Sequence, residues 1–269
     1  MSEYSDALKS TLAGQPIDPN HQAVVIPDNM HVHDLENLHD APRRIKQDIE
    51  LIEVKSFTDY VRRFGDKART VVKADIRSQR FVAVLDYHET QSVPGWCSHT
   101  ATYNCPISRE WRTWTGRNGK LMAQAEFADF MEANKDAIAP HNGEGPDSTQ
   151  MLEVSRNVRA TQKVEFKSSI NLSNGDTQFE YQQKTDGTTG AAKGKIDVPS
   201  EFWLQVPVYE GDDAYAIKAR LRYRIKEGML VMWYELINPD VIAEDAFRHT
   251  LETIDAQAEG HAVVFRAAT

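Results

Sequence analysis

The sequence predicts an α+β protein, with an antiparallel β-meander sheet, helices packed on one side of it and an extended N-terminal arm. Apolar residues fall at helical spacing in several segments between residues 57 and 158. From residue 160 to residue 237 they mostly alternate with polar residues, which is the period of strands with one covered face. Residues 1–30 are polar and interrupted by prolines, which indicates an arm with little core of its own.

We expect residues 31–269 to form a single domain, with room for an internal boundary near 140–150, where glycine and proline are frequent. Of the 269 residues, 41% are hydrophobic and 26% are charged, which suits a globular protein with a real core. The formal net charge is −9, whereas domains that bind duplex DNA are usually basic. The bulk charge therefore argues against duplex binding, but an acidic protein can still carry one local basic track.

The first half predicts strands and helices in alternation. Phe81–Leu85 is apolar on both faces, which predicts a central strand covered on each side, and further strands are expected at 49–54 and 100–105. A helix over 57–64 follows the capping-box pattern that begins at Ser56, and it stops at Gly65. Two further helix faces are expected, one with Trp111 and Trp114 and one with Phe127, Phe130, Met131 and Ile138.

The second half predicts a meander of about five strands that ends in a helix. Asn174-Gly175 is expected to form a hairpin turn, because both residues tolerate a positive φ. Later strands are expected at 202–208, 218–226 and 229–237. Asn238-Pro239-Asp240 then starts the last helix with a cap, a proline in the first turn and an acid at the helix dipole.

The stretch from residue 218 to residue 226 carries a cation at every second position, and we refer to these residues as the basic ladder: Lys218, Arg220, Arg222, Arg224 and Lys226. On a strand this spacing puts all five on one face. Alternate residues of a strand lie about 6.5–7 Å apart, similar to the phosphate spacing of an extended single strand. Three partners are compatible with the ladder: single-stranded nucleic acid, an acidic surface of a second subunit, or cross-strand acids such as Glu235 on a solvated face.

Nearby aromatic residues are not predicted to serve for base stacking. Tyr223 alternates with the arginines and therefore points to the opposite face. Trp203 and Trp233 are interpreted as residues that fill the core. The expected role of the basic ladder is accordingly electrostatic.

Asp86, His88 and His99 are the candidates for a metal site, since carboxylate and imidazole suit zinc or manganese. The alternative is a hydrogen-bonded network at the place where two strands leave the core. We expect no resident metal or other cofactor. The histidines at 31, 33 and 39 are interpreted as surface residues.

Other chemical patterns are incomplete. The loop 187–194 resembles a phosphate loop, but Ala192 precedes Lys193 and Gly194 follows it, where glycine and Ser/Thr are needed. The pairs Glu53/Lys55 and Glu165/Lys167 have the spacing of a metal-dependent nuclease if they lie on strands. Neither a Gly-x-Ser-x-Gly elbow nor a His-Glu-x-x-His motif is present, so the motifs do not support catalysis.

Cysteine content and hydropathy predict a cytoplasmic protein. Cys97 and Cys105 are too few for a disulfide scaffold and are expected to be reduced, buried thiols. The N-terminal residues lack an apolar segment of signal-peptide length. No run approaches the ~18 apolar residues of a membrane-spanning helix, so we expect no membrane partner.

Four blocks of the sequence, in order, carry a family resemblance: Phe81–His88, Phe127–Asn134, Ala219–Ile225, and Trp233–Ile237 with Pro239. Together they resemble the YfdQ-like family, which tailed phages and prophages encode and which is catalogued as a domain of unknown function. The resemblance runs from residue 25 to residue 255. It implies a phage origin and a single domain, and it implies no activity, cofactor or catalytic residue.

Three functions are compatible with these observations. The first is a non-enzymatic phage accessory protein that assembles into a homo-oligomer, with the basic ladder and the N-terminal arm at its subunit contacts. The second is a binder of single-stranded nucleic acid in phage replication or recombination. The third is a metal-dependent hydrolase that uses Asp86, His88 and His99 or one of the Glu-x-Lys pairs.

Overall fold

The computed structural model describes residue 36 and residues 40–158, 177–183, 192–227 and 229–267. The chain divides into two units, Met1–Ile45 and Lys46–Thr269, and every helix and strand below lies in the second unit. The N-terminal arm, the Asn174-Gly175 turn, the Glu165/Lys167 pair and the three histidines at 31, 33 and 39 lie outside the described residues. Within those residues, no helix is long and apolar enough to cross a membrane.

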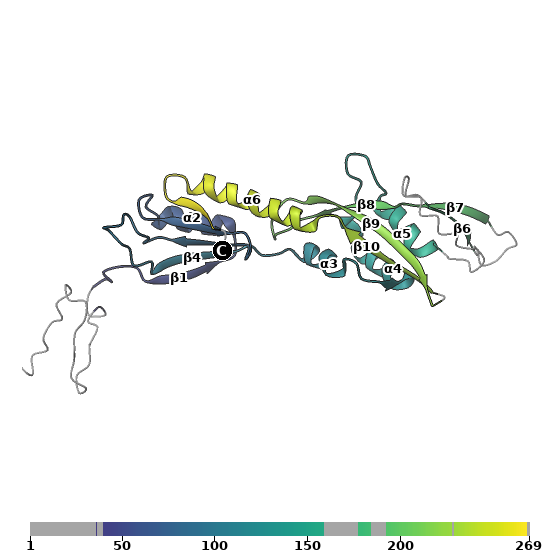
Figure 1. Ribbon diagram of the computed structural model, residues 1–269, viewed down its shortest axis with the longest axis horizontal. Coiled ribbons are helices and arrows are strands. Elements are labelled where there is room, and N and C mark those ends of the chain that lie inside the picture. Colours follow the sequence, from purple (N-terminus) through teal and green to yellow (C-terminus); the bar gives the residue numbers. More distant parts are fainter. Residues whose placement is uncertain (1–35, 37–39, 159–176, 184–191, 228, 268–269) are drawn as a thin grey trace, which may run out of the picture. The chain divides into compact units, whose positions relative to one another are not determined.

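A five-stranded sheet forms one part of the second unit (Figure 1). Its order is β1-β4-β3-β2-β11, with β3 at the centre as the two-sided apolar pattern predicts. The β1–β4 and β2–β11 pairs are parallel, whereas β3 is antiparallel to both of its neighbours. The strands are β1 (Gln47–Leu51), β2 (Val71–Asp75), β3 (Arg80–Val84), β4 (His99–Asn104) and β11 (Val263–Ala267).

Two helices cover one face of this sheet, α2 (Val54–Phe64) and α6 (Pro239–Ala258). The register places Val72, Ala83 and Ala101 side by side on the covered face, where all three are fully buried. Phe247 of α6 stacks on Phe81 of β3 with ring centroids 4.7 Å apart. The apolar stripe of α6 is therefore held by the sheet, which is how amphipathic helices gain most of their stability.

The basic ladder belongs to a second, four-stranded sheet of order β5-β10-β9-β8. Tyr234 of β10 packs edge-on against Trp114, and its hydroxyl donates a 2.6 Å hydrogen bond to the carbonyl of that tryptophan. Phe130 packs against the same tryptophan, so the predicted helix faces do meet the sheet. The strands are β5 (Met122–Ala123), β8 (Glu201–Val206), β9 (Tyr215–Lys226) and β10 (Met229–Leu236), and the helices packed nearby are α3 (Arg109–Arg117), α4 (Gln124–Ala133) and α5 (Ser148–Asn157).

The structure confirms the α+β class, but its strands do not form one meander sheet. Besides the two sheets above, β6 (Thr177–Gln183) and β7 (Ala192–Val198) pair as a separate two-stranded sheet. Most pairings are antiparallel, with parallel pairs only at β1–β4 and β2–β11 among the named strands. The period of two predicts strands, but it does not say which strands become neighbours.

Several local predictions need correction. Helix α2 begins at Val54, before the predicted capping box, and Glu53 occupies its N-cap position. The pair Glu53/Lys55 therefore does not lie on a strand face, which removes the spacing on which a nuclease-like site depended. Helix α4 ends at Ala133, and Ile138 instead forms a bridge with Leu204 of β8.

The last helix begins at Pro239 as predicted, but Asn238 does not cap it through its side chain. Asn238 lies in the left-handed region with φ 50° and ψ 50°. Asparagine tolerates this conformation better than most residues do. The role of Asn238 is therefore to turn the chain from β10 into α6.

We predict that Phe247→Ala lowers the free energy of unfolding by about 3–5 kcal/mol, because it leaves a cavity beneath Phe81. Val241→Ala in the same helix is the control, since Val241 is 52% exposed and its loss should change stability by less than about 0.5 kcal/mol. Urea denaturation of both variants provides the measurement. Equal effects of the two changes would show that α6 is not anchored through Phe247.

Candidate functional site

The basic ladder lies on one face of β9, and its apolar neighbours lie on the other. Ile217, Ala219 and Leu221 are buried, whereas Arg222 and Lys226 are exposed. Arg220 and Arg224 are exposed as well, and Lys218 is half-buried. The alternation predicted from the sequence is therefore present in the structure.

Two acids on neighbouring strands pair with three of the five cations. Glu201 of β8 and Glu235 of β10 lie opposite Arg220, one on each side of β9. Glu201 contacts Lys218 Nζ at 2.9 Å and Arg220 Nε at 3.5 Å, and Glu235 contacts Arg222 Nε at 3.2 Å. Pairing with a cross-strand acid, one of the three alternatives for the basic ladder, is therefore present at Glu235.

The pKa of both carboxyl groups is lowered. The hydrogen bond from Lys218 is the main cause at Glu201, with Arg220 adding to it. At Glu235 the main cause is a hydrogen bond from Trp233 Nε1, and Arg222 contributes further. Both acids are therefore held in the charged form that the cations need.

Trp203 and Trp233 lie on the same face as the basic ladder, which corrects the expectation that they fill the core. Trp203 is opposite Lys218 and Trp233 is opposite Arg222, and residues directly opposite across a strand pair share a face. Lys218 Nζ lies 5.0 Å from the ring centre of Trp203, and Arg224 Cζ lies 5.5 Å from that of Trp233. Both tryptophans are half-buried.

The sequence pattern around these tryptophans indicates the direction in which their side chains face. Phe202 and Leu204 flank Trp203, and Met232 and Tyr234 flank Trp233; all four flanking residues are fully buried. Because the side-chain period of a strand is two, both tryptophans had to face away from that core. We name the surface formed by the five cations, Glu201, Glu235, Trp203 and Trp233 the cation–tryptophan face.

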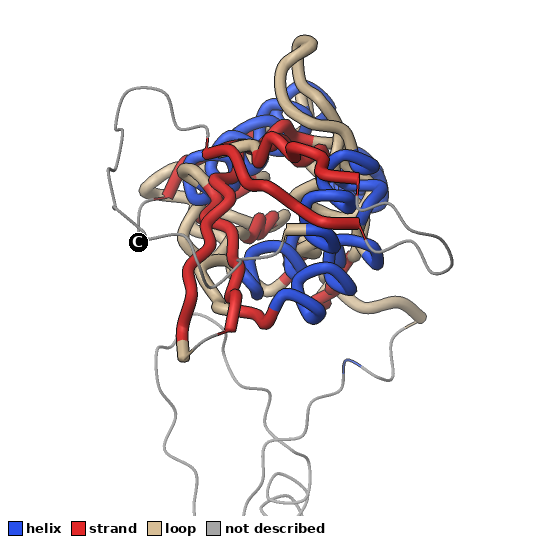
Figure 2. The backbone as a smooth tube through the Cα atoms, turned by 90° about the vertical axis from the view of Figure 1, so that its right-hand side faces the viewer, coloured by secondary structure: helices blue, strands red, loops and turns tan. Residues whose placement is uncertain are grey.

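The end of β9 extends beyond β8. Strand β8 pairs with β9 only as far as Arg220, and the Leu221 N–H donates to the carbonyl of Ser200. From there to Lys226 the named neighbour of β9 is β10, so the two strands form a ribbon (Figure 2). Arg224 and Lys226 form no ion pair within the part of the chain that the structure describes.

Asp86, His88 and His99 are structural residues at the connection between β3 and β4. The Asp86 carboxylate accepts three hydrogen bonds of 3.0 Å, from the Ser98 N–H and hydroxyl and from the His99 N–H. Burial would raise the pKa of Asp86, but these hydrogen bonds together lower it. His88 Nδ1 accepts from the Gly95 N–H at 3.0 Å.

The third candidate ligand, His99, is 5% exposed and turns toward α2. Its Nε2 lies 2.8 Å from the Tyr60 hydroxyl. Among the described residues, no group of three or more histidine, cysteine or acidic side chains could hold a metal ion. The arrangement fits the hydrogen-bonded network that was the alternative to a metal site.

Both cysteines are free thiols, and the surroundings of Cys105 do not suit nucleophilic chemistry. Cys105 is buried, and burial raises the pKa of its thiol to about 12. A thiol with so high a pKa is almost never a thiolate near neutral pH. Cys97 is only half-buried, which differs from the expectation of two buried thiols.

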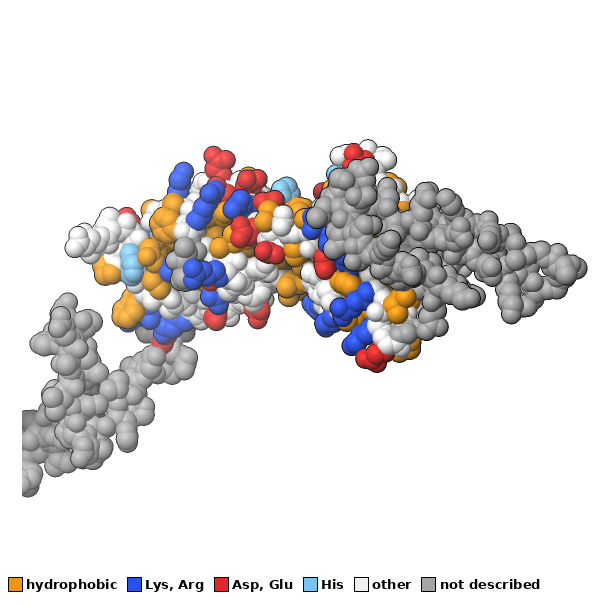
Figure 3. Space-filling model, turned by 45° about the vertical axis from the view of Figure 1, so that its right-hand side comes forward, with side chains coloured by type: hydrophobic (Ala, Val, Ile, Leu, Met, Phe, Trp, Pro, Cys, Tyr) orange, Lys and Arg blue, Asp and Glu red, His pale blue; other side chains and the backbone are white. Residues whose placement is uncertain are grey.

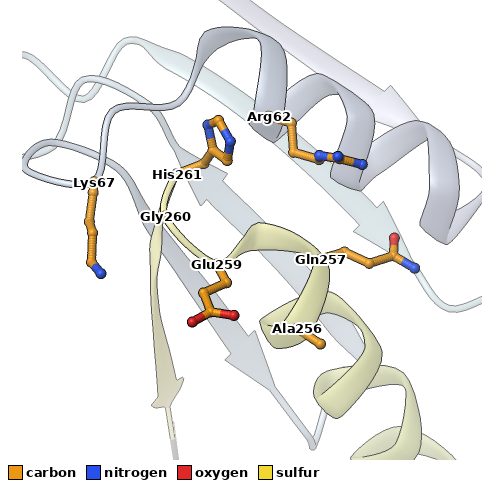
Figure 4. A pocket seen from close by; sticks show the side chains of 7 residues that line it. All are labelled: Arg62, Lys67, Ala256, Gln257, Glu259, Gly260 and His261. Atoms are coloured by element: carbon orange, nitrogen blue, oxygen red, sulfur yellow. The ribbon is translucent and has the colours of Figure 1, made fainter.

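A polar hollow lies where α2 and α6 end (Figure 4). Basic and acidic side chains line it together, among them Arg62, Lys67 and Glu259. The remaining lining residues are Ala256, Gln257, Gly260 and His261. This mixture does not favour one charge of ligand, so the cation–tryptophan face is the stronger candidate site.

The family model described as "Uncharacterized conserved protein (DUF2303)" matches residues 4–265, which is nearly the whole chain. The comparisons found no matching curated protein and no matching solved structure.

We predict that stability falls as the pH drops from 7.5 to 5.5, in part because of His99. Burial lowers the pKa of His99 in the folded protein, whereas in the unfolded chain it has the ordinary value of about 6.5. At a pH between these two pKa values, the imidazole is protonated in the unfolded chain but not in the folded protein. The slope from one such group is at most about 1.4 kcal/mol per pH unit. In His99→Gln the loss over this interval should be smaller, as measured by urea denaturation at each pH.

Tyr60→Phe provides the control, because it removes the hydroxyl near His99 and keeps the burial. We expect the pKa of His99 to stay low in this variant when it is followed by NMR titration. A titration of His99 at or above the ordinary value in the unmodified protein would contradict the prediction.

Proposed function

We propose that this chain, which belongs to the DUF2303 family of conserved proteins, binds single-stranded nucleic acid through the cation–tryptophan face. The observation that carries the proposal is the position of Trp203 and Trp233 beside the basic ladder. Proteins that bind single strands without strong sequence preference combine positive charge along the backbone with aromatic rings on which bases stack. Both components occur here on one sheet face.

The spacing of the cations supports the proposal. Successive ladder residues are about 6.5–7 Å apart along β9, close to the distance between phosphates of an extended strand. The cations closest to the ribbon end, Arg224 and Lys226, have no acidic partner in the described residues. A phosphate at this end would gain a charge contact without displacing a protein carboxylate.

The two acids on this face offset part of its positive charge but do not cancel it. Five cations share the face with Glu201 and Glu235. The paired side chains are between about a third and a half exposed, and exposed ion pairs contribute only about 0–1 kcal/mol each. Exchange of a carboxylate for a phosphate therefore costs little.

A single strand fits this face better than a duplex does. The net charge is −9, and on the side of the molecule shown in Figure 3 basic side chains lie among acidic and hydrophobic ones. Tryptophan stacking also requires unpaired bases, which only a single strand offers. Arg224 rests on Trp233 in the free protein and would have to move aside or stack on the far side of a base.

The resemblance to a phage and prophage family suggests where such binding is used. Replication and recombination of phage genomes expose single strands, and a small acidic protein with one basic face suits a transient accessory role there. This role requires no catalytic group.

We predict that the triple variant Arg222→Gln, Arg224→Gln, Lys226→Gln weakens binding of a fluorescein-labelled 20-nucleotide single strand about 100-fold at 0.1 M salt. Each lost phosphate contact should reduce the slope of log K against log salt by about 0.7. Fluorescence anisotropy across a salt series measures both quantities. The matched control removes three cations elsewhere, through Lys55→Gln, Lys135→Gln and Arg248→Gln, and should bind normally.

Equal weakening by the two triple variants would mean that only bulk charge matters, and it would reject the assigned face. Absence of salt-dependent binding by the unmodified protein would reject nucleic-acid binding altogether.

We predict a separate contribution from base stacking. Trp233→Leu should weaken single-strand binding by about 1–3 kcal/mol, the usual value for one stacked base, while leaving the salt slope unchanged. Trp96→Leu is the control, because Trp96 is 75% exposed and follows β3, away from this face in the sequence. A variant that changes the slope of log K against log salt without weakening the binding would contradict a stacking role for Trp233.

A further inference from the structure

Strand β11 is an edge of the five-stranded sheet, and its outer side has no partner among the named strands. It pairs in parallel with β2 alone. Val263 is 40% exposed and Phe265 is 47% exposed. An exposed apolar edge strand is a template for pairing with another chain, and proteins usually protect such edges unless they use them.

The direction of the backbone groups shows which residues are available for pairing. The Val263 N–H donates to the Thr70 carbonyl at 3.0 Å, so residue 263 bonds toward β2. Backbone groups of successive strand residues point to opposite sides, so Phe265 also bonds toward β2. The N–H and C=O groups of Val264 and Arg266 therefore point outward from the sheet.

The side chains of β11 divide between the two faces of the sheet. Val264 packs against the core beneath the helices, and its register partner Val72 is fully buried there. Arg266 shares that face by alternation. Val263 and Phe265 lie on the opposite face, which neither α2 nor α6 covers.

We propose that a second copy of this chain pairs with β11 in antiparallel fashion, about a two-fold axis at Phe265. In this register Val264 faces the partner's Arg266 as a hydrogen-bonded pair, and Phe265 faces the partner's Phe265 as a non-hydrogen-bonded pair. The two outward-pointing residues of each strand are thereby satisfied, and the aromatic rings meet where antiparallel side chains approach most closely. The contact is isologous, as closed two-fold dimers require.

The charges beside β11 favour a second copy of this chain as the partner, instead of an unrelated strand. Gln257 of α6 accepts a hydrogen bond from Thr58 of α2, so that flank of α6 faces α2. Helical geometry puts Asp255 on the other flank, toward the β11 edge, and in Figure 4 Glu259, which follows the end of the helix, points to a different side than Gln257. Neither acid forms an ion pair within the described part of the chain.

The partner's Arg266 would reach this acidic flank. After the turn at Gly260, β11 runs back beside α6. A strand rises about 3.3 Å per residue and a helix about 1.5 Å per residue. On this basis Val264 lies alongside the last two turns of α6. The partner's Arg266, opposite Val264, therefore lies beside Asp255. Each dimer would contain two such pairs.

This inference is independent of nucleic-acid binding, because it involves the other sheet and different residues. It assigns a specific contact to the self-assembly that the sequence led us to expect. The sequence predicts subunit contacts at the basic ladder and the N-terminal arm, whereas the edge geometry favours β11.

Cysteine cross-linking tests the register directly in the full-length chain carrying Cys97→Ser. Phe265→Cys should give a disulfide-linked dimer under mild oxidation, because its two copies would be about 4.5 Å apart between Cα atoms, within disulfide range. Val263→Cys is the matched control: it faces position 267 of the partner, and its two copies would be about 13 Å apart. Cross-linking of Phe265→Cys alone supports the register, while no cross-link, or equal cross-linking of both variants, overturns it.

Sedimentation velocity of the unmodified chain and of Arg266→Pro supplies the second test. The outward N–H of residue 266 bonds only in the dimer, and proline is tolerated on an edge strand, so this change should shift a dimer to monomer with an unaltered circular dichroism spectrum. A chain that is monomeric at every concentration would overturn the proposal, as would a dimer that Arg266→Pro does not weaken.

A charge swap tests the assigned ion pair. Arg266→Glu and Asp255→Arg should each weaken dimerisation about 5-fold or more, and the double variant should recover the affinity of the unmodified chain. Additive weakening in the double variant would overturn the pairing of Arg266 with Asp255.

Discussion

The candidate site depends on the burial of one face of β9. Ile217, Ala219 and Leu221 have almost no exposure, and a strand that buries every second residue must turn the intervening ones outward. The five cations therefore share one face for the same reason that the sheet is stable. A shift of one residue in the register would bury the cations without acidic partners. The free energy lost by burying them would be far larger than the free energy that any contact on the exposed face contributes.

The neighbouring strands convert this row of cations into a mixed surface. The same alternation in β8 and β10 brings Glu201 and Trp203 to one side of the ladder and Trp233 and Glu235 to the other. The acids hold three cations in defined positions, and the tryptophans have cations above their rings. We regard this surface as preorganised for an extended anion with flat rings, which is the chemistry of an unpaired nucleic-acid strand.

Much of this arrangement could be predicted from residue patterns. The central position of β3 followed from its two-sided apolar pattern, and the exposed ladder followed from the period of two. The outward positions of Trp203 and Trp233 follow from the same rule, because their neighbours in β8 and β10 are buried, and this periodicity outweighs the general preference of tryptophan for the interior. The sheet to which each strand belongs could not be predicted from local patterns. The parallel pairing of β11 with β2, for example, joins residues nearly two hundred positions apart.

Photo-cross-linking tests the central claim most directly. A single-stranded oligonucleotide that carries 5-iodouracil, irradiated with the full-length protein and digested for mass spectrometry, should attach mainly to peptides that contain Trp233 or Trp203, because excited iodouracil reacts with a stacked aromatic ring. Cross-links confined to other peptides, or cross-links that an excess of unlabelled single strand does not reduce, would contradict the assignment of the cation–tryptophan face.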